Sequence, residues 1–389
     1  MGYARHRGAL EPEAERDGRL PSPGIVIERP KGRAALEEFA RLPYYIYNRR
    51  DAWWPPDIQN EVDLLTGRSP LSPHIEIEPM CARRNGKLVA RVSVVVNHRY
   101  NRHWNERLGQ LVHFEAMPGE DEAVAVMLER AVERVRERGM AAVRTGFAAF
   151  LDYPYAIDNY NELPSFLLRG NPPYYHCYLK NAGFETEKGQ TDYTAALSGE
   201  ILERYRGMVE AAERGGARLV SWRDFGFLAA IDGWTDVTNS AFERHWGWNP
   251  VSRAESRTML SSLWDTPVAD LSVLAVAGGE VVGAVFSVPD LSATLAYVKP
   301  GMRLAPERGG GTRGALINIG VVEKMRGRGI ARAMAARSFL EMARRGARYA
   351  GYTLVLDDNW ASRRTAESLG AHVTSNFLTY RRELASRAR

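Results

Sequence analysis

Cysteine is scarce in this sequence of 389 residues, which contains only Cys81 and Cys177. Neither has a partner at the spacing that metal ligands require. The sequence therefore supports neither a disulfide framework nor a zinc site. Two unpaired cysteines suit a reducing compartment, so we expect a cytoplasmic protein without a bound metal.

Long apolar runs are missing as well. No segment approaches the roughly 18 to 20 uninterrupted apolar residues of a membrane-spanning helix. Hydrophobic residues at 45% and charged residues at 25% are usual for globular domains. Residues 1–23 mix Arg, Glu, Gly and Pro without an apolar core, which excludes a secretory signal and predicts a disordered tail. We expect no membrane span and leave peripheral contact with a membrane surface open.

A concentrated basic region is also absent. The net charge is +5, and the arginines are scattered rather than run together. Because no basic helix or aromatic-basic platform stands out, a nucleic-acid partner is not expected. We interpret the excess as solvated surface, with attraction to an anionic ligand or a membrane surface as the alternative.

What the sequence does contain is the same order of features twice. A chain of this length is expected to form two domains. The segment Gly199 to Arg218 is polar, charged and punctuated by glycine, so we place a domain boundary near Ser198. The predicted organisation is a tail over residues 1–23, a first domain over residues 24–198 and a second over residues 199–389.

Each half predicts a hairpin, a strand, a helix, a strand and a second helix. The hairpin turns are Asn85-Gly86 and Gly278-Gly279, which join β-type runs. The expected strands cover residues 79–83, 88–96, 108–116 and 141–145, and residues 271–276, 281–288, 315–322 and 352–356. Apolar periodicity predicts helices over residues 122–138 and 329–345. Shorter helices follow and end at Gly183 and Gly370, so the repetition indicates an internal duplication.

The most informative segment is a glycine-rich turn between a strand and a helix in the second half. Its sequence is Arg326-Gly327-Arg328-Gly329-Ile330-Ala331. Free N–H groups and the positive end of the dipole make a helix N-terminus suitable for a pyrophosphate. The glycines let the backbone approach phosphate oxygens, and the arginines can add charge-assisted hydrogen bonds. A Walker loop and a complete dinucleotide fingerprint are missing. The alternative is a surface turn with two solvated arginines.

This turn resembles a signature of the GNAT superfamily of acyl-CoA N-acyltransferases, Arg/Gln-x-x-Gly-x-Gly/Ala, which is met by Arg326, Gly329 and Ala331. A second family element, Asn-x-x-Ala/Ser followed by Gly-Phe/Ala, is matched by Asn359, Ser362 and Gly370-Ala371. The resemblance covers residues 219–384. It implies an α/β (α+β) fold of tandem GNAT domains, each a mixed, mostly antiparallel twisted sheet flanked by helices.

The resemblance also implies that acyl-CoA is the co-substrate, with its pantetheine arm in a gap beside the strand that precedes the turn. The implied coenzyme A-binding residues are Val321, Val322, Arg326, Gly327, Arg328, Gly329, Ile330, Ala331, Asn359 and Ser362. Asn359 fits a helix N-cap equally well, and the two roles are compatible. Many family members place a tyrosine, the proton donor to the thiolate, where this sequence has Ala366. The general acid is therefore absent, supplied from elsewhere, or water.

The first half looks like a degenerate second copy. Its helix follows Met117-Pro118-Gly119-Glu120-Asp121-Glu122, where carboxylates stand in place of arginines. Acidic side chains suit a helix N-terminus but repel a pyrophosphate, so we expect no coenzyme A site here. The tyrosines of this half are interpreted as core or domain interface ahead of substrate contact; they are Tyr153, Tyr155, Tyr160, Tyr174 and Tyr175.

Transfer to an amine requires a group that removes a proton, a task for a carboxylate or histidine. The catalytic candidates are Glu255, which follows the aromatic segment 242–248, and Asp290, which ends a strand near where the acceptor approaches in this fold. Weaker candidates are Glu243, His245 and Glu323. Each can also be an ordinary surface charge, and His245 a packed side chain. The aromatic segment is either a structural tryptophan cluster or the wall of a pocket for an apolar acceptor or acyl chain.

The sequence thus predicts an N-acyltransferase that moves an acetyl or longer acyl group from acyl-CoA to an amine, with the second half catalytic. The whole chain is similar to bacterial tandem-GNAT proteins, and the bacterial ceramide-synthase type implies a long-chain lipid amine as an alternative acceptor. Since Ala366 replaces the tyrosine, a non-catalytic protein that senses acyl-CoA or binds a partner is a third interpretation. The acceptor, the acyl length and the oligomeric state stay open.

Overall fold

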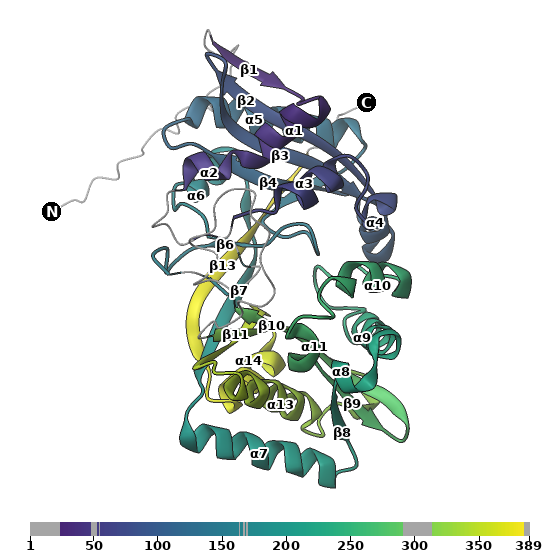
Figure 1. Cartoon of the computed structure of the whole chain (residues 1–389). Coiled ribbons are helices and arrows are strands. Elements are labelled where there is room, and N and C mark those ends of the chain that lie inside the picture. The colour runs from purple at the N-terminus through teal and green to yellow at the C-terminus, as the bar shows by residue number, and fades with distance from the viewer. Residues whose placement is uncertain are drawn as a thin grey trace, which may run out of the picture.

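The computed structural model describes residues 24–47, 53, 55–162, 164, 165, 168, 170–290 and 313–384. The tail predicted over residues 1–23 lies outside this part. The described chain forms a 13-stranded sheet covered by helices (Figure 1). Its strands are β1 (Ile25–Glu28), β2 (Ile75–Arg84), β3 (Lys87–Asn97), β4 (Leu108–Ala116), β5 (Ala142–Thr145), β6 (Tyr155–Ala156), β7 (Glu185–Ala196), β8 (Arg218–Ser221), β9 (Val273–Ala277), β10 (Glu280–Asp290), β11 (Arg313–Val321), β12 (Tyr349–Leu356) and β13 (His372–Glu383).

The helices lie on both faces of this sheet. They are α1 (Gly32–Arg41), α2 (Pro43–Ile46), α3 (Ile58–Leu65), α4 (His98–Trp104), α5 (Asp121–Glu137), α6 (Tyr175–Asn181), α7 (Gly199–Arg214), α8 (Trp222–Phe225), α9 (Phe227–Ala241), α10 (Arg253–Ser261), α11 (Val268–Leu271), α13 (Ile330–Arg344) and α14 (Trp360–Ser368), with 3-10 turns η1 (Ser72–His74) and η3 (Glu323–Met325). Among the described residues, no helix is long and apolar enough to cross a bilayer.

Both predicted hairpins are confirmed. Asn85 and Gly86 have φ angles of 51° and 80°, and Gly278 and Gly279 have φ angles of 59° and 82°. Positive φ at both central residues gives a two-residue turn whose twist matches the paired strands. Among the described strands, β4 with β5 and β11 with β12 pair in parallel, and the other pairs are antiparallel. The mixed, mostly antiparallel sheet with flanking helices is therefore as predicted.

The two halves exchange their last strands. Strand β7 comes from the first half but lies between β12 and β13, with Tyr193 opposite Tyr352. Strand β13 comes from the second half but also pairs with β5, where Arg381 lies opposite Arg144. Figure 1 shows β7 and β13 running between the halves. One sheet therefore passes through both halves, and the boundary near Ser198, directly after an exchanged strand, stays a prediction.

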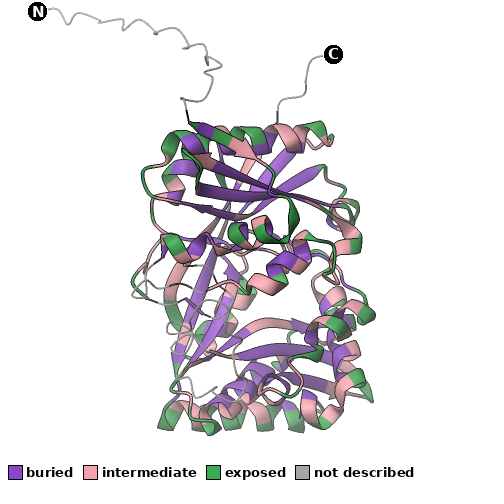
Figure 2. Ribbon diagram, turned by 45° about the horizontal axis from the view of Figure 1, so that its top comes forward, coloured by how far each residue is buried: buried purple, intermediate pink, exposed green. Residues whose placement is uncertain are grey.

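The polar segment that follows Ser198 forms helix α7. Its buried residues, Tyr205 and Ala212, lie on one face that packs on the same core as α13, while the charged residues face outward. The 3.6-residue spacing of a few apolar residues is sufficient for this, because a surface helix needs only one apolar stripe. Figure 2 shows the same pattern throughout, with buried residues concentrated on the strands and exposed residues on the outer helices.

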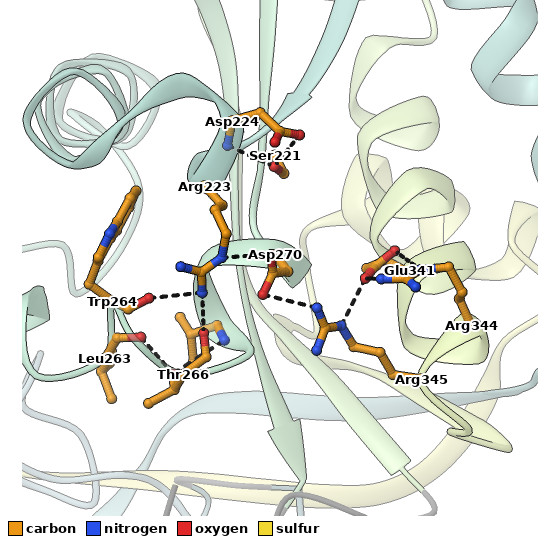
Figure 3. A network of polar contacts seen from close by, with 11 residues as sticks. Ser221, Arg223, Asp224, Leu263, Trp264, Thr266, Asp270, Glu341, Arg344 and Arg345 are labelled. Atoms are coloured by element: carbon orange, nitrogen blue, oxygen red, sulfur yellow. Dashed lines mark hydrogen bonds and ion pairs between the residues drawn. The ribbon is translucent and has the colours of Figure 1, made fainter. Parts of the chain in front are cut away.

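A polar network fixes the helices of the second half to one another (Figure 3). Asp270 of α11 accepts a hydrogen bond from Arg223 Nε of α8 at 2.8 Å and pairs with Arg345 Nη2 at 3.0 Å. Arg345 also pairs with Glu341 of α13 at 2.8 Å. Burial alone would raise the pKa of Glu341, but hydrogen bonds from Arg344 and Arg345 lower it overall. Glu341 therefore stays charged at neutral pH, and the network as a whole holds α8, α11 and α13 in one arrangement.

Candidate active site

A gap opens in the second half where two parallel strands diverge. Strands β11 and β12 pair only from Arg313 with Tyr349 to Leu316 with Tyr352. Beyond Leu316, β11 continues to Val321 with no described strand on its β12 side. Its pairing with β10 shifts register at this point, which places an extra residue, Ile317, in β11. Such a bulge re-aims the strand, and the backbone at the gap is left available to a ligand.

The glycine-rich turn lies at the open end of this gap. Gly327 and Gly329 have φ angles of 78° and 76°, which favour glycine. A Cβ at Gly327 would meet nothing within 4 Å, so the requirement comes from backbone conformation. Gly329 is the N-cap of α13, and the Ala333 N–H is bonded to the Gly329 carbonyl. The N–H groups that precede Ala333 in the first turn have no carbonyl partner within the helix. A pyrophosphate can therefore accept hydrogen bonds from them.

Arg326 holds the turn in place. Its Nε donates to the Val321 carbonyl at 3.1 Å, and its Nη2 donates to the Ala241 carbonyl at the end of α9 at 3.0 Å. The sequence suggested a phosphate contact, but these bonds give Arg326 a structural task as well. Val322 is engaged in the same way, because its N–H donates to Val282 and its carbonyl accepts from Met325.

Asn359 and Ser362 lie on the other side of the gap. Asn359 Oδ1 accepts from the Ser362 N–H at 3.1 Å, so Asn359 is the N-cap of α14. The Ser362 hydroxyl lies 3.0 Å from the phenol of Tyr352. Ala366, at the position of the family tyrosine, is fully buried in the same hydrophobic cluster as Tyr352.

A single cavity of about 1110 Å³ joins the turn, the gap and an apolar chamber. Of the implied coenzyme A residues it contacts Val321, Arg326, Gly327, Gly329, Ile330, Ala331, Asn359 and Ser362, but not Val322 or Arg328. The cavity thus brings these residues together from the two sides of the gap, and their binding role stays a prediction. The chamber is lined by apolar side chains of the second half, namely Trp234, Phe242, Trp246, Trp248, Met259, Leu260, Leu263 and Phe286.

The first half supplies the opposite wall. Phe147, Phe150 and Tyr153 reach the cavity from the loop after β5, and Gln190 reaches it from the exchanged strand β7. Gln190 is 2% exposed, and neither atom of its amide has a hydrogen-bond partner among the described residues. Asn318 of β11 also lines the cavity, and its Oδ1 likewise has no hydrogen-bond partner among the described residues. Buried amides without partners are costly, so both suit a polar group of a ligand.

The aromatic segment 242–248 fits both interpretations of the sequence. It lines the cavity, and it also packs against the first half. The Trp104 indole N–H donates to the Trp248 carbonyl at 2.8 Å, and the rings of Phe147 and Trp246 lie 5.2 Å apart. The Arg144 guanidinium lies 4.7 Å from the centre of the Trp246 ring. The first half therefore positions the segment that covers the chamber.

The structure separates the candidate bases. Glu243, His245 and Glu323 contact the cavity, but Glu255 does not. Glu255 Oε2 accepts a 2.9 Å hydrogen bond from Arg99 of the first half, and its carboxylate also completes a capping box with Ser252. Burial alone would raise the pKa of Glu255, but the hydrogen bonds from these partners lower it overall. Asp290 ends β10 opposite Arg313, and its side chain lies outside the described part.

His245 is the cavity group best suited to accept a proton. Its Nδ1 lies 3.1 Å from the Trp246 carbonyl, which can only accept, so Nδ1 carries the hydrogen and Nε2 keeps a lone pair. Burial lowers the pKa of His245 below its usual value. The imidazole is therefore neutral at physiological pH, as a general base must be.

The equivalent gap of the first half is filled by its own side chains. Strands β4 and β5 pair only from Leu108 to Leu111, as in the second half. The Tyr175 hydroxyl accepts from the Ala116 N–H at 2.8 Å, and the Tyr174 hydroxyl donates to the Ala116 carbonyl at 2.9 Å. Tyr178 accepts from the Glu120 N–H, just before α5, at 3.2 Å. Three tyrosines of the α6 region thus bond to the backbone that a pantetheine arm would need.

The connecting loop of the first half is also shorter. Residues 117–120 join β4 to α5, whereas residues 322–329 join β11 to α13. Glu120 pairs with Arg84 at 2.7 Å, and Asp121 and Glu122 occupy the first turn of α5. These carboxylates interact with the positive end of the helix dipole, where a pyrophosphate would otherwise bind.

Comparisons with known proteins agree with this geometry. Residues 234–371 match the acetyltransferase (GNAT) family model. The bacterial ceramide synthase of Caulobacter vibrioides is 25% identical over 271 residues, covering 68% of this chain and 70% of that protein. A glucosamine N-acetyltransferase region of a fungal multi-domain β-N-acetylglucosaminidase has a TM-score of 0.59 at 15% identity; the match covers 95% of this chain and 39% of that protein. A tandem GNAT protein from the clavulanic acid pathway has a TM-score of 0.55 at 12% identity, over 93% and 98% of the two chains.

Proposed function

Because this chain is a tandem protein of the GNAT family, we propose that it transfers an acyl group from acyl-CoA to an amine bound in the central cavity. One observation carries the proposal, namely that the turn at residues 326–331, the gap beside β11 and the apolar chamber form one continuous space. A thioester entering through the gap would therefore reach an acceptor held in the chamber. The second half would bind acyl-CoA, and the first half would complete the acceptor wall.

The lining of the chamber favours an amine or an acyl group with a long hydrocarbon chain. Aromatic and aliphatic side chains from both halves line it, and the volume is large for acetyl transfer to a small amine. The unpaired amide of Gln190 and the unpaired Oδ1 of Asn318 can bind the polar end of such a molecule. The similarity to a bacterial ceramide synthase supports the same class of acceptor.

Chain length should therefore control the rate. With a fixed acyl-CoA, kcat/KM for primary alkyl amines should rise by up to about fourfold per added methylene until the chamber is filled, from the transfer energy of a methylene group. The measurement is release of free coenzyme A thiol across an amine series. Polyamines and amino sugars serve as polar controls. Faster turnover of the polar amines would contradict a lipid acceptor, and no turnover with any amine would contradict acyl transfer.

The catalytic base can be assigned with three variants. His245→Gln should lower kcat at neutral pH by about 100-fold, which is within the usual range for a general base. In the wild type, activity should fall as the pH drops through the lowered pKa of His245, because the imidazole then becomes protonated. The His245→Gln variant should lack this pH dependence. Glu255→Gln and Arg99→Gln both break the Arg99–Glu255 ion pair between the halves, and Glu255→Gln also weakens the 3.5 Å contact of Glu255 with His74, so each should lower stability by about 1–3 kcal/mol and leave kcat unchanged.

The comparison of the two ion-pair variants is the control. If Glu255 were the base, Glu255→Gln would abolish turnover and Arg99→Gln would not. Equal loss of melting temperature with unchanged kcat in both would instead place Glu255 in the interface between the halves.

The non-catalytic alternative rests on Ala366. It predicts that acyl-CoA binds with ordinary affinity, measured by calorimetry, and that no amine accelerates thiol release. Detection of an amide product by mass spectrometry would exclude it.

A further inference from the structure

Tyr352 lies where the gap closes. It is the last residue of β12 that pairs with β11, and its side chain contacts the cavity. The residue is 2% exposed, and its hydroxyl is 3.0 Å from Ser362 Oγ. Both hydroxyls therefore border the narrow end of the gap, one from the sheet and one from α14.

The narrow end is also where a threaded thioester must stop. An arm that starts at the turn near Gly329 and follows β11 moves toward Leu316, where the strands are again paired. The reactive end of such an arm would therefore lie beside Tyr352. The family position for a tyrosine on α14 holds Ala366, and Tyr352 belongs to the same buried cluster.

We propose that the Tyr352 hydroxyl donates a hydrogen bond to the sulfur that leaves during acyl transfer, and that Ser362 orients it. This assignment rests on the proposed function. In this arrangement Ser362 Oγ–H would donate to the Tyr352 oxygen, 3.0 Å away, and the phenolic hydrogen would be left for the sulfur. Tyr352 thus does from β12 what a tyrosine at position 366 would do from α14.

The step is balanced with the amine, the thioester, a base and water. The amine nitrogen forms a bond to the thioester carbon, the carbon–sulfur bond breaks, and the electron pair of that bond goes to sulfur. The nitrogen loses one proton to the base, and the sulfur gains one from water after departure. Burial raises the pKa of Tyr352 to about 12, whereas a thiol ionises near 8.5. The phenol therefore keeps its proton and acts as a hydrogen-bond donor at every working pH.

Tyr352→Phe should lower kcat by about 10- to 100-fold and leave the affinity for acyl-CoA unchanged, since the lost donor acts on developing charge. The deficit should shrink with an acyl-seleno-CoA donor, whose more acidic leaving group needs less stabilisation. Tyr205→Phe is the matched control. Tyr205 is equally buried in the same cluster and donates to the Leu369 carbonyl at 2.6 Å, but it does not contact the cavity. That variant should lose stability and keep kcat.

A measurement on free coenzyme A tests the assignment even if the acceptor is misidentified. Ultraviolet titration of bound coenzyme A measures the acid dissociation constant of its thiol. This constant should be about tenfold larger in the wild type than in Tyr352→Phe, because only the wild type has a hydroxyl that donates a hydrogen bond to the thiolate. Ser362→Ala should give an intermediate value. Equal ionisation in wild type and Tyr352→Phe overturns the proposal, whereas a shifted ionisation without turnover of any amine would instead overturn the proposed function.

Discussion

Replacing Gly329 by glutamate should reduce the affinity for acyl-CoA by about 100- to 1,000-fold. Gly329 has a φ of 76° and caps the N-terminus of α13. A glutamate there adds backbone strain of about 1–2 kcal/mol. It also places a carboxylate beside the expected pyrophosphate, where like charges about 4 Å apart repel by about 4 kcal/mol at an effective dielectric constant of 20. Isothermal calorimetry with acyl-CoA measures the loss.

Gly346→Glu is the matched control, because Gly346 follows the other end of the same helix. Its φ is 91°, a Cβ there would meet nothing within 4 Å, and it does not contact the cavity. Both variants should lose similar melting temperature, but only Gly329→Glu should lose binding. Unchanged affinity in Gly329→Glu would remove the turn from the coenzyme A site.

Local features of the fold could be predicted from the sequence. The turns at Asn85-Gly86 and Gly278-Gly279 require positive φ, and the flanking strands follow from β-type residues. The buried face of α5 contains Val124 and Met127, as its apolar periodicity indicates. These features depend on interactions between residues close in the chain, which composition and spacing specify directly.

Features that depend on distant partners could not be predicted. Nothing in β7 or β13 indicates that each pairs across the halves, since hydrogen bonding between backbones is independent of side-chain identity. The burial of Gln190 against the cavity was missed for the same reason, because a glutamine in a strand is polar surface unless its neighbours are known. Glu255 was placed near the acceptor from its position after the aromatic segment, yet Arg99 draws it to the interface between the halves.

The first half resembles the second in backbone but differs in what fills its gap. Tyr175 and Tyr178 bond to the backbone at the gap, and Glu120 stands at the helix N-terminus with Arg84 as its partner. Strands β4 and β5 of this half still diverge, but side chains of the same half make the hydrogen bonds that a ligand would otherwise make. Its remaining contributions are the cavity wall and strand β7, which couple the site to the integrity of the whole chain.

Residues 199–389 expressed alone should fail to form a cooperatively folded protein. This fragment lacks β7, so β12 and β13 each lose a neighbouring strand, and β13 also loses β5. Unpaired strand edges of this length promote aggregation. The core around Tyr193 and Ala195, on which α7 and α13 pack, would also be exposed. Gel filtration and thermal unfolding should show aggregates or a transition without cooperativity.

Co-expression of residues 1–198 with residues 199–389 should restore the structure, because the first fragment supplies β5 and β7 and the second supplies β12 and β13. The two should purify together and bind acyl-CoA, whereas a first fragment that ends at residue 184 should not rescue its partner. Cooperative unfolding and full acyl-CoA affinity in residues 199–389 alone would contradict the coupling. The boundary near Ser198 would then separate independent domains, whereas association of the fragments would make it a junction inside one shared sheet.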